Sequence, residues 1–141
     1  YDDALARVTA LDAWDAPRRL EVALEEVGAV TERERELTAL SVGQRYRVRL
    51  AGVIAARADL VDKLKGLGLS VVDSEAPFVL VNTSSLSGDS IRQPLAERGF
   101  AVRRGETFPG LGPTWIRLAV RDSNIHAELA RAISDLTAHR N

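Results

Sequence analysis

The sequence predicts an α+β domain with two layers, in which helices cover a small, mostly antiparallel sheet, preceded by a helical N-terminal segment. Two observations lead to this fold class. The first is a change of hydrophobic period, because residues 2–66 repeat apolar side chains with helical spacing, whereas short valine-rich runs follow Gly66-Leu67-Gly68. The second is the order of elements beyond residue 68, which reads strand, strand, helix, strand, strand, helix.

The first clear helix is expected to begin at Asp15-Ala16-Pro17. An aspartate accepts hydrogen bonds from the free N–H groups of a first turn, and proline fits there because it has no N–H to leave unpaired. Gly28 predicts the end of this helix, since glycine closes many helices. Its buried side is predicted from the spacing of three apolar residues, Leu20, Leu24 and Val27.

A second helical pattern runs from about Leu37 to Gly66. Thr31 with Glu34 forms the sequence of a capping box just before it. Residues 44–50 alternate arginine with Tyr, Val and Leu, which taken alone also fits a short strand. Because this stretch lies between two helical patterns, we expect it to be helical.

The second half of the chain is expected to contain four short strands and two helices. The strands are predicted at Leu69–Val72, Phe78–Val81, Phe100–Arg103 and Trp115–Val120. A short helix before the third strand carries Ile91 and Leu95, and Pro94 requires that helix to start late.

The last helix is expected to be capped by Asp122 or Ser123. One apolar stripe on it is predicted to be buried, formed by Ile125, Leu129, Ile133 and Leu136. His126 lies beside this stripe, and we expect it to be exposed and without a role.

Composition disfavours several classes of protein. The chain has 141 residues, the size of one ordinary domain, with no cysteine and a formal net charge of -1. Because thiols are absent and only His126 and His139 supply imidazole, we do not expect a metal site. The charge balance disfavours nucleic-acid binding, and no apolar run approaches the roughly 18 residues of a membrane span.

The expected location is the cytoplasm. The first residues, Tyr1-Asp2-Asp3-Ala4-Leu5, have neither the basic nor the apolar region of a secretory signal. The lack of cysteine is consistent with a reducing compartment. The chain starts at Tyr1 and contains no methionine, which fits a segment of a longer polypeptide.

The strongest candidate for chemistry is Arg117. Side chains alternate across a strand, so Ile116 and Leu118 are expected to face the core and Arg117 the opposite side. A guanidinium held on a rigid strand suits bidentate binding of a carboxylate or a phosphate. Arg103 and Arg104 end the preceding strand and could supply a second contact to an anion.

Other interpretations of these residues remain open. Arg117 could instead pair with an acidic neighbour such as Glu106, or simply cover the open face of the sheet. Arg103 and Arg104 could be solvated strand ends. The sequence contains no phosphate-binding G-x-x-x-x-G-K-[ST] pattern, and no nucleophile with its base can be assembled from it.

Two stretches resemble the C-terminal small domain of fold-type-I pyridoxal-phosphate-dependent aminotransferases of class I/II, in the histidinol-phosphate aminotransferase group. The first is an arginine-led helix, a Leu-Gly stop, a strand and an S-x-A-x-F turn, seen here from Arg57 through Gly66-Leu67-Gly68 to Ser74-Glu75-Ala76-Pro77-Phe78. The second is Phe108-Pro109-Gly110-Leu111 followed by Ile116-Arg117-Leu118-Ala119-Val120. It is similar to the threonine-phosphate decarboxylases of cobalamin biosynthesis. The resemblance covers roughly Arg57–Leu136.

The resemblance implies a dimeric enzyme whose large domain holds pyridoxal phosphate as a Schiff base on a lysine. The small domain would close over an amino-acid or phospho-amino-acid substrate. Arg117 would bind the substrate α-carboxylate, and Arg104 or Arg103 would hold another anionic group. Lys63 and Lys65 are the only lysines and match nothing catalytic in the family. We therefore expect no covalently bound cofactor and no catalysis by this chain alone.

Residues 1–45 do not match the family, so two domains are expected. These are a helical N-terminal extension of unclear origin (1–45) and an aminotransferase-like small domain (46–141). A different hypothesis is a stand-alone, non-catalytic interaction or anion-binding module derived from that domain and able to form a homodimer. Its contact surfaces would be the sheet face around Trp115 and the apolar stripe of the first helix.

Overall fold

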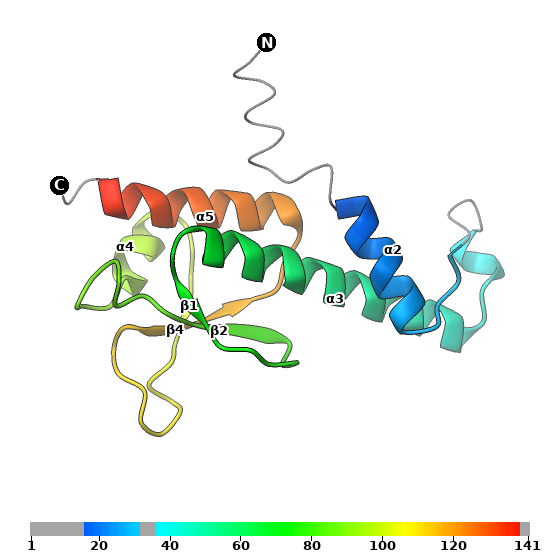
Figure 1. Ribbon diagram of the computed structural model, residues 1–141, viewed down its shortest axis with the longest axis horizontal. Helices are drawn as coiled ribbons and strands as arrows, with labels where there is room; N and C mark the ends of the chain where they lie inside the picture. Colours follow the sequence, from blue (N-terminus) through cyan, green and yellow to red (C-terminus); the bar gives the residue numbers. More distant parts are fainter. Residues whose placement is uncertain (1–15, 32–35, 139–141) are drawn as a thin grey trace, which may run out of the picture. The chain divides into compact units, whose positions relative to one another are not determined.

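The computed structural model describes residues 16–31 and 36–138, whose helices and strands are drawn in Figure 1. The chain forms two compact units, Tyr1–Ala58 and Asp59–Asn141. Their boundary falls within the long helix α3 (Val42–Gly66). The expected cap at Asp15 and the expected capping box of Thr31 with Glu34 involve residues outside the described ranges. The domain boundary expected after residue 45 remains a prediction.

The described part of the first unit is helical, as predicted. Helix α2 (Ala16–Glu26) ends at Gly28, whose φ of 59° lies in the left-handed region that glycine tolerates. The Ala29 N–H donates to the Leu24 carbonyl at 2.8 Å and closes the last turn. A short 3-10 helix, η1 (Leu37–Ala39), precedes α3, and the ambiguous stretch 44–50 is helical.

Helix α3 begins at a capping box that the sequence analysis overlooked. The Gln44 N–H donates to Ser41 Oγ at 3.2 Å, and the Ser41 N–H donates to Gln44 Oε1 at 2.9 Å. Two N–H groups that a helix start leaves unpaired are satisfied reciprocally in this way. The S-x-x-Q spacing was visible in the sequence.

The core of the first unit is small and lies between α2 and α3. Its buried members are Ala23, Leu24 and Ala51, joined by the partly buried Val27, Val48, Ile54 and Ala55. The predicted stripe is correct for Leu24 and Val27, but Leu20 is 37% exposed. Ala23 contributes to this core instead, because its small side chain lets a helix approach closely.

The second unit contains the expected antiparallel sheet. Its strands are β1 (Ser70–Val71), β2 (Phe78–Asn82), β3 (Arg103–Arg104) and β4 (Trp115–Ala119). They lie in the order β1-β2-β4-β3, and every neighbouring pair is antiparallel. Two helices complete this unit, the short α4 (Arg92–Glu97) and α5 (Ser123–Ala138). The α+β class with a helical N-terminal segment is therefore confirmed.

One face of the sheet carries the core of the second unit. Alternate residues of the two central strands point into it: Val79, Val81, Ile116 and Leu118. The helices contribute Leu60 and Leu64 from α3, Leu95 from α4, and Leu129, Ala132 and Ile133 from α5. Each fully buried leucine or isoleucine stabilises the fold by about 1.5–3 kcal/mol relative to exposure. The other face of the sheet carries the remaining residues of β2 and β4.

Three details of the second unit differ from expectation. The third strand was predicted from Phe100 but covers only Arg103–Arg104, because the Phe100 N–H donates to the Leu95 carbonyl at 2.9 Å and closes α4 instead. Ile125 is 39% exposed, so its place in the predicted stripe was wrong. His126 is buried with 1% exposure and was also wrongly placed.

Candidate anion-binding site

Arg117 lies at the centre of the open face of the sheet, on β4. Its Cζ atom is 5.5 Å from the ring centroid of Phe78 and 5.5 Å from that of Phe108. The two rings are 6.0 Å apart and tilted by 38°. A guanidinium in contact with two aromatic rings is attracted to their electron-rich faces. The rings therefore hold the cation in one place.

Among the described residues, one hydrogen-bond donor of this arginine has no partner. The Arg117 Nε atom is buried, and among the described residues nothing accepts its hydrogen. A buried donor left unpaired costs about 1–3 kcal/mol, so native proteins seldom keep one without a reason. The alternative in which Arg117 pairs with Glu106 finds no support among the described residues. An incoming carboxylate or phosphate would supply the missing acceptor.

Strand register decides which second arginine lies near the first. Arg103 pairs directly with Arg117, and Leu80 pairs with it from the other side. Directly opposed residues of antiparallel strands share a face, so Arg103 and Arg117 lie together on the open face. Arg104 pairs with Ile116, whose side chain points into the core, so Arg104 belongs to the other face. Both Arg103 and Arg104 are exposed.

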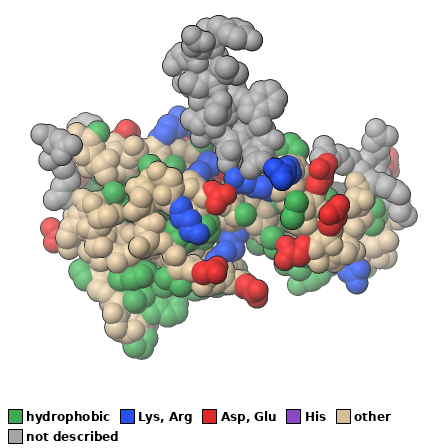
Figure 2. Space-filling view, viewed as in Figure 1, with side chains coloured by type: hydrophobic (Ala, Val, Ile, Leu, Met, Phe, Trp, Pro, Cys, Tyr) green, Lys and Arg blue, Asp and Glu red, His purple; other side chains and the backbone are tan. Residues whose placement is uncertain are grey.

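The loop between β3 and β4 carries Phe108 to this site. The Gly105 N–H donates to the Trp115 carbonyl at 2.7 Å, and the Phe108 N–H donates to the Gly105 carbonyl at 2.9 Å. A Cβ atom on Gly105 would lie 2.6 Å from the Trp115 Cβ, so only glycine fits there. Figure 2 shows hydrophobic side chains gathered over this loop. The contact between Gly105 and Trp115 therefore fixes the start of the loop against β4.

Neither aromatic ring was predicted to belong to the site. Phe78 could have been placed on the open face, because it alternates with Val79 along the predicted strand. Phe108 gave no such signal, since it lies in a loop whose conformation has no sequence period. The predicted arginine, by contrast, lies on the face where strand alternation put it.

A second group of polar side chains lies on the covered side of the sheet. Asp59 on α3 accepts a hydrogen bond from Lys63 one turn later and contacts His126 Nδ1 at 2.8 Å. Burial alone raises the pKa of Asp59, but the hydrogen bonds from Lys63 and His126 outweigh it and lower the pKa below the ordinary 3.8. This carboxyl is therefore ionised at neutral pH and belongs to the core.

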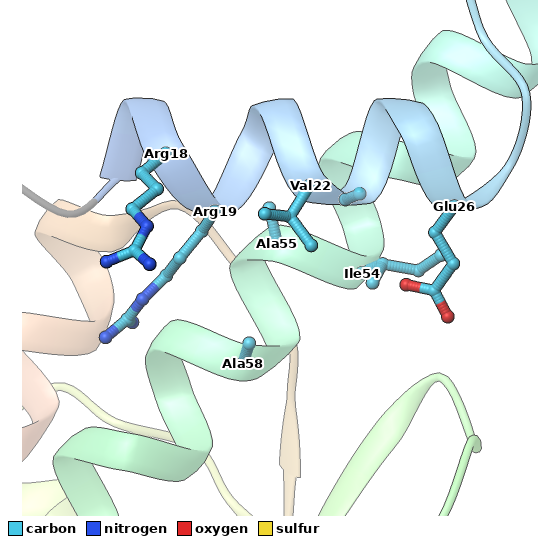
Figure 3. Close-up of a pocket in the computed structure, with 8 residues that line it drawn as sticks. Arg18, Arg19, Val22, Glu26, Ile54, Ala55 and Ala58 are labelled. Atoms are coloured by element: carbon cyan, nitrogen blue, oxygen red, sulfur yellow. The ribbon is translucent and has the colours of Figure 1, made fainter.

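A cavity of about 340 Å³ lies between α2 and α3 in the first unit. Figure 3 shows Arg18 and Arg19 at one end and Glu26 at the other. The wall between them is apolar and is formed by Val22, Ala23, Ile54, Ala55 and Ala58. Arg18 and Glu26 are exposed, and the cavity contains no buried polar group that would fix a ligand.

The described residues contain neither a membrane-spanning helix nor a cluster of metal ligands. No helix in residues 16–31 or 36–138 is long and apolar enough to cross a membrane. In the same ranges, no group of three His, Cys, Asp or Glu side chains is arranged to hold a metal ion. The face around Arg117 is therefore the candidate site that the geometry favours.

Comparison with known proteins identifies similarity across most of the chain. A family model described as aminotransferase class I and II matches residues 36–134. A histidinol-phosphate aminotransferase of Mycobacterium tuberculosis is 48% identical over 67 residues, which is 48% of this chain but only 18% of that protein. The chain thus spans less than a fifth of the length of that relative.

A solved structure extends the similarity to the fold. A double mutant of Thermus thermophilus aspartate aminotransferase superposes with a TM-score of 0.56 and 26% identity. The superposition covers 66% of this chain and 25% of that one. Here too, only a part of the aminotransferase corresponds to the chain.

One further relative is of a different kind. The ATP-binding protein EcfA1 of an energy-coupling factor transporter from Streptococcus sanguinis is 39% identical over 72 residues. This match covers 51% of the present chain and 25% of EcfA1.

Proposed function

Because the chain belongs to the aminotransferase class I and II family through residues 36–134, we propose that its second unit is the substrate-closing small domain of a pyridoxal-phosphate-dependent enzyme. The reaction would be transamination, or decarboxylation of an amino-acid phosphate by an enzyme of the threonine-phosphate decarboxylase type. The observation that carries this proposal is the buried Arg117 Nε, which has no acceptor in the described part of the chain and belongs to a guanidinium held by two aromatic rings.

In this proposal Arg117 binds the substrate α-carboxylate. The Nε–H and one terminal N–H of a guanidinium match the two oxygens of a carboxylate. Phe78 and Phe108 exclude water from the contact, which strengthens the charge interaction. A second anionic group, such as a phosphate, would bind to Arg103, which shares the open face with Arg117. The register favours Arg103 over Arg104 for this role.

The family's cofactor fits this chain only in part. Pyridoxal phosphate supplies an electron sink when bound to such an enzyme. Its usual attachment is a lysine, and the two lysines here both belong to α3, which packs on the covered face of the sheet. Lys63 is also engaged by Asp59. We therefore propose that residues outside this chain hold the cofactor, while this unit binds and encloses the substrate.

The test is a calorimetric or NMR titration of the 141-residue chain with L-phosphothreonine. We expect weak binding that is lost in Arg117→Ala and kept in Arg121→Ala, because Arg121 carries an equal charge on an exposed side chain. An equal loss of affinity in both variants would mean that phosphothreonine binds through general charge attraction and not through the Arg117 site. Transamination or decarboxylation by the purified chain would contradict the proposed lack of activity.

A second candidate function, that of an interaction module, is favoured by the first unit. Four apolar residues are exposed along one side of α3: Val42 (75%), Tyr46 (68%), Leu50 (40%) and Val53 (47%). Their spacing of four, four and three residues places them in one row. The residues that contact α2 lie on the opposite side of the same helix. A large exposed apolar row of this kind is typical of an interaction surface.

We propose that this first unit docks on a protein partner through the exposed apolar row. Arg45 and Arg49 edge the apolar row, and no Asp or Glu occurs between Leu37 and Ala58. Two copies that met through this row would place like charges together, which disfavours self-association. The partner that fits is a protein surface with carboxylates beside an apolar strip.

Dye binding and light scattering test the interaction module. The chain should enhance the fluorescence of anilinonaphthalene sulfonate, and the double variant Tyr46→Glu, Leu50→Glu should lose most of that signal. Val72→Glu, which changes an exposed apolar residue of the second unit, is the matched control. Light scattering should report a monomer throughout. If light scattering shows a dimer that the double variant disrupts, the partner of this row is a second copy of the chain and not an acidic protein surface.

A further inference from the structure

His126 is a buried histidine whose two ring nitrogens are both engaged. Its Nδ1 lies 2.8 Å from Asp59 Oδ2, and its Nε2 lies 2.9 Å from the backbone nitrogen of Arg121. The Arg121 N–H can only donate, so Nε2 must be the unprotonated acceptor. Nδ1 then carries the hydrogen and donates it to Asp59. His126 is therefore a neutral imidazole held in one tautomer.

This histidine acts at the point where the sheet ends. The ladder between β2 and β4 closes with the pair Phe78 and Ala119. Arg121 follows two residues later, beyond the last pair, and no strand of the described residues pairs with its N–H. His126 accepts that N–H instead, and thereby prolongs the ordered part of the chain past the sheet. Lys63 holds Asp59 from the other side and so fixes the partner of the ring.

The last pair of the ladder contains one of the two rings that hold Arg117. Phe78 is the first residue of β2, where a strand frays most easily, and its ring is 5.5 Å from the Arg117 Cζ. If the Phe78–Ala119 pair opens, the Phe78 ring moves away from the Arg117 guanidinium. Resting on the proposed function, we infer that His126 is a positioning residue for the Arg117 site. It holds the Phe78–Ala119 end of the ladder closed through the Arg121 N–H.

Two substitutions separate this role from simple packing. His126→Gln keeps an acceptor near the place of Nε2 but loses the donor to Asp59. His126→Asn keeps a donor near the place of Nδ1 but loses the acceptor for Arg121. Both remove an aromatic ring from the core, and because Asn is one methylene shorter than Gln, packing alone predicts a graded loss of stability. Packing alone does not predict that the Phe78–Ala119 contact is lost in one variant and kept in the other. A positioning residue would give different results.

The experiment uses NMR on the 141-residue chain. Wild type should show the Nδ1–H tautomer at His126, and a cross-strand nuclear Overhauser contact between Phe78 and Ala119. His126→Asn should lose that contact and bind L-phosphothreonine about tenfold more weakly, because a lost buried hydrogen bond is worth roughly one factor of ten. His126→Gln should retain both. Where His126→Asn does not fold, Arg121→Pro takes its place because it removes the N–H. Arg121→Ala, which loses the same guanidinium but keeps the N–H, is its control.

The inference is overturned if the two variants behave alike, or if wild type shows the Nε2–H tautomer. Its failure is distinguishable from failure of the proposed function. If wild type binds no phosphothreonine, the carboxylate proposal is wrong. The comparison of the Phe78–Ala119 contact between the two variants then still decides whether His126 holds the end of the sheet.

Discussion

Arg103 and Arg117 lie directly opposite each other on β3 and β4, on the same open face of the sheet. Like charges in directly opposed positions destabilise a sheet by roughly 0.2–1 kcal/mol. A site that binds an anion with two charged groups would offset this repulsion when occupied. The pair is therefore expected to reduce stability in the free protein and to favour binding.

The first prediction concerns Arg103→Ala. Removing this charge should raise the melting temperature slightly at low salt, and 0.5 M salt should abolish the gain, since exposed charges are then screened. The same change should weaken phosphothreonine more than a monoanion such as acetate. Arg104→Ala is the matched control, because its side chain belongs to the other face. An equal loss of affinity in the control would contradict the assignment of Arg103.

The second prediction concerns Gly105. In Gly105→Ala the new Cβ would lie 2.6 Å from the Trp115 Cβ and 2.8 Å from the Trp115 carbonyl oxygen, which is bonded to the Gly105 N–H. Neither group belongs to a flexible side-chain end, so the strands must move apart. We expect a loss of about 1–3 kcal/mol, the usual range for overpacking. Chemical denaturation measures it.

The control for that prediction is Gly112→Ala in the same loop. Nothing lies within 4 Å of the Cβ that this substitution would add. It should change the free energy of unfolding by less than about 0.5 kcal/mol, as surface substitutions usually do. If both variants are equally stable, the close approach of Gly105 to Trp115 is not a constraint on the loop.

The third prediction follows from the low pKa of Asp59. Hydrogen bonds from Lys63 and His126 stabilise the ionised carboxyl in the folded state more than burial opposes it. The unfolded chain then binds a proton more readily than the folded one. The stability contributed by Asp59 should be fully present above pH 3.8 and lost as the pH falls through the lowered pKa.

Urea midpoints between pH 6 and pH 2.5 measure this dependence. Asp59→Asn should be less stable than wild type at pH 6, and the difference should shrink toward the acid end of the range. Asp73→Asn is a suitable control, because Asp73 is exposed. Parallel curves for wild type and Asp59→Asn would show that Asp59 does not link stability to pH.

Patterns with a period were sufficient to predict most of the fold. The Arg117 side chain was predicted on the correct face of the sheet, because backbone geometry fixes the alternation of side chains along a strand. Helix α3 was predicted despite the alternation of residues 44–50, since neighbouring helical patterns outweigh a short ambiguous run. Arg103 and Arg104 could not be told apart, because register between distant strands is not encoded in either strand alone.

The missed features depend on contacts between distant segments. His126 was expected to be exposed, yet it lies three residues before Leu129 and seven before Ile133, which is the spacing of a buried stripe. Its polarity hid that signal, and its partner Asp59 is 67 residues away. Phe108 reached the site through a loop whose path follows from the Gly105 and Trp115 contact. Contacts between distant segments produce no periodic pattern in the sequence, so they could not be predicted from it.

The last prediction concerns Gly52, within the longest helix. Glycine in a helix interior costs about 0.5–1 kcal/mol relative to alanine, because the unfolded chain loses more freedom on folding. Nothing lies within 4 Å of the Cβ that Gly52→Ala would add, and its φ is not in the left-handed region. The substitution should therefore raise the free energy of unfolding by about that amount, measured by thermal unfolding followed by circular dichroism at 222 nm.

Gly68→Ala, at a φ of 75°, should lower the free energy of unfolding instead, because alanine is strained where the chain turns out of the helix. Stabilisation by both substitutions would contradict the left-handed turn after α3.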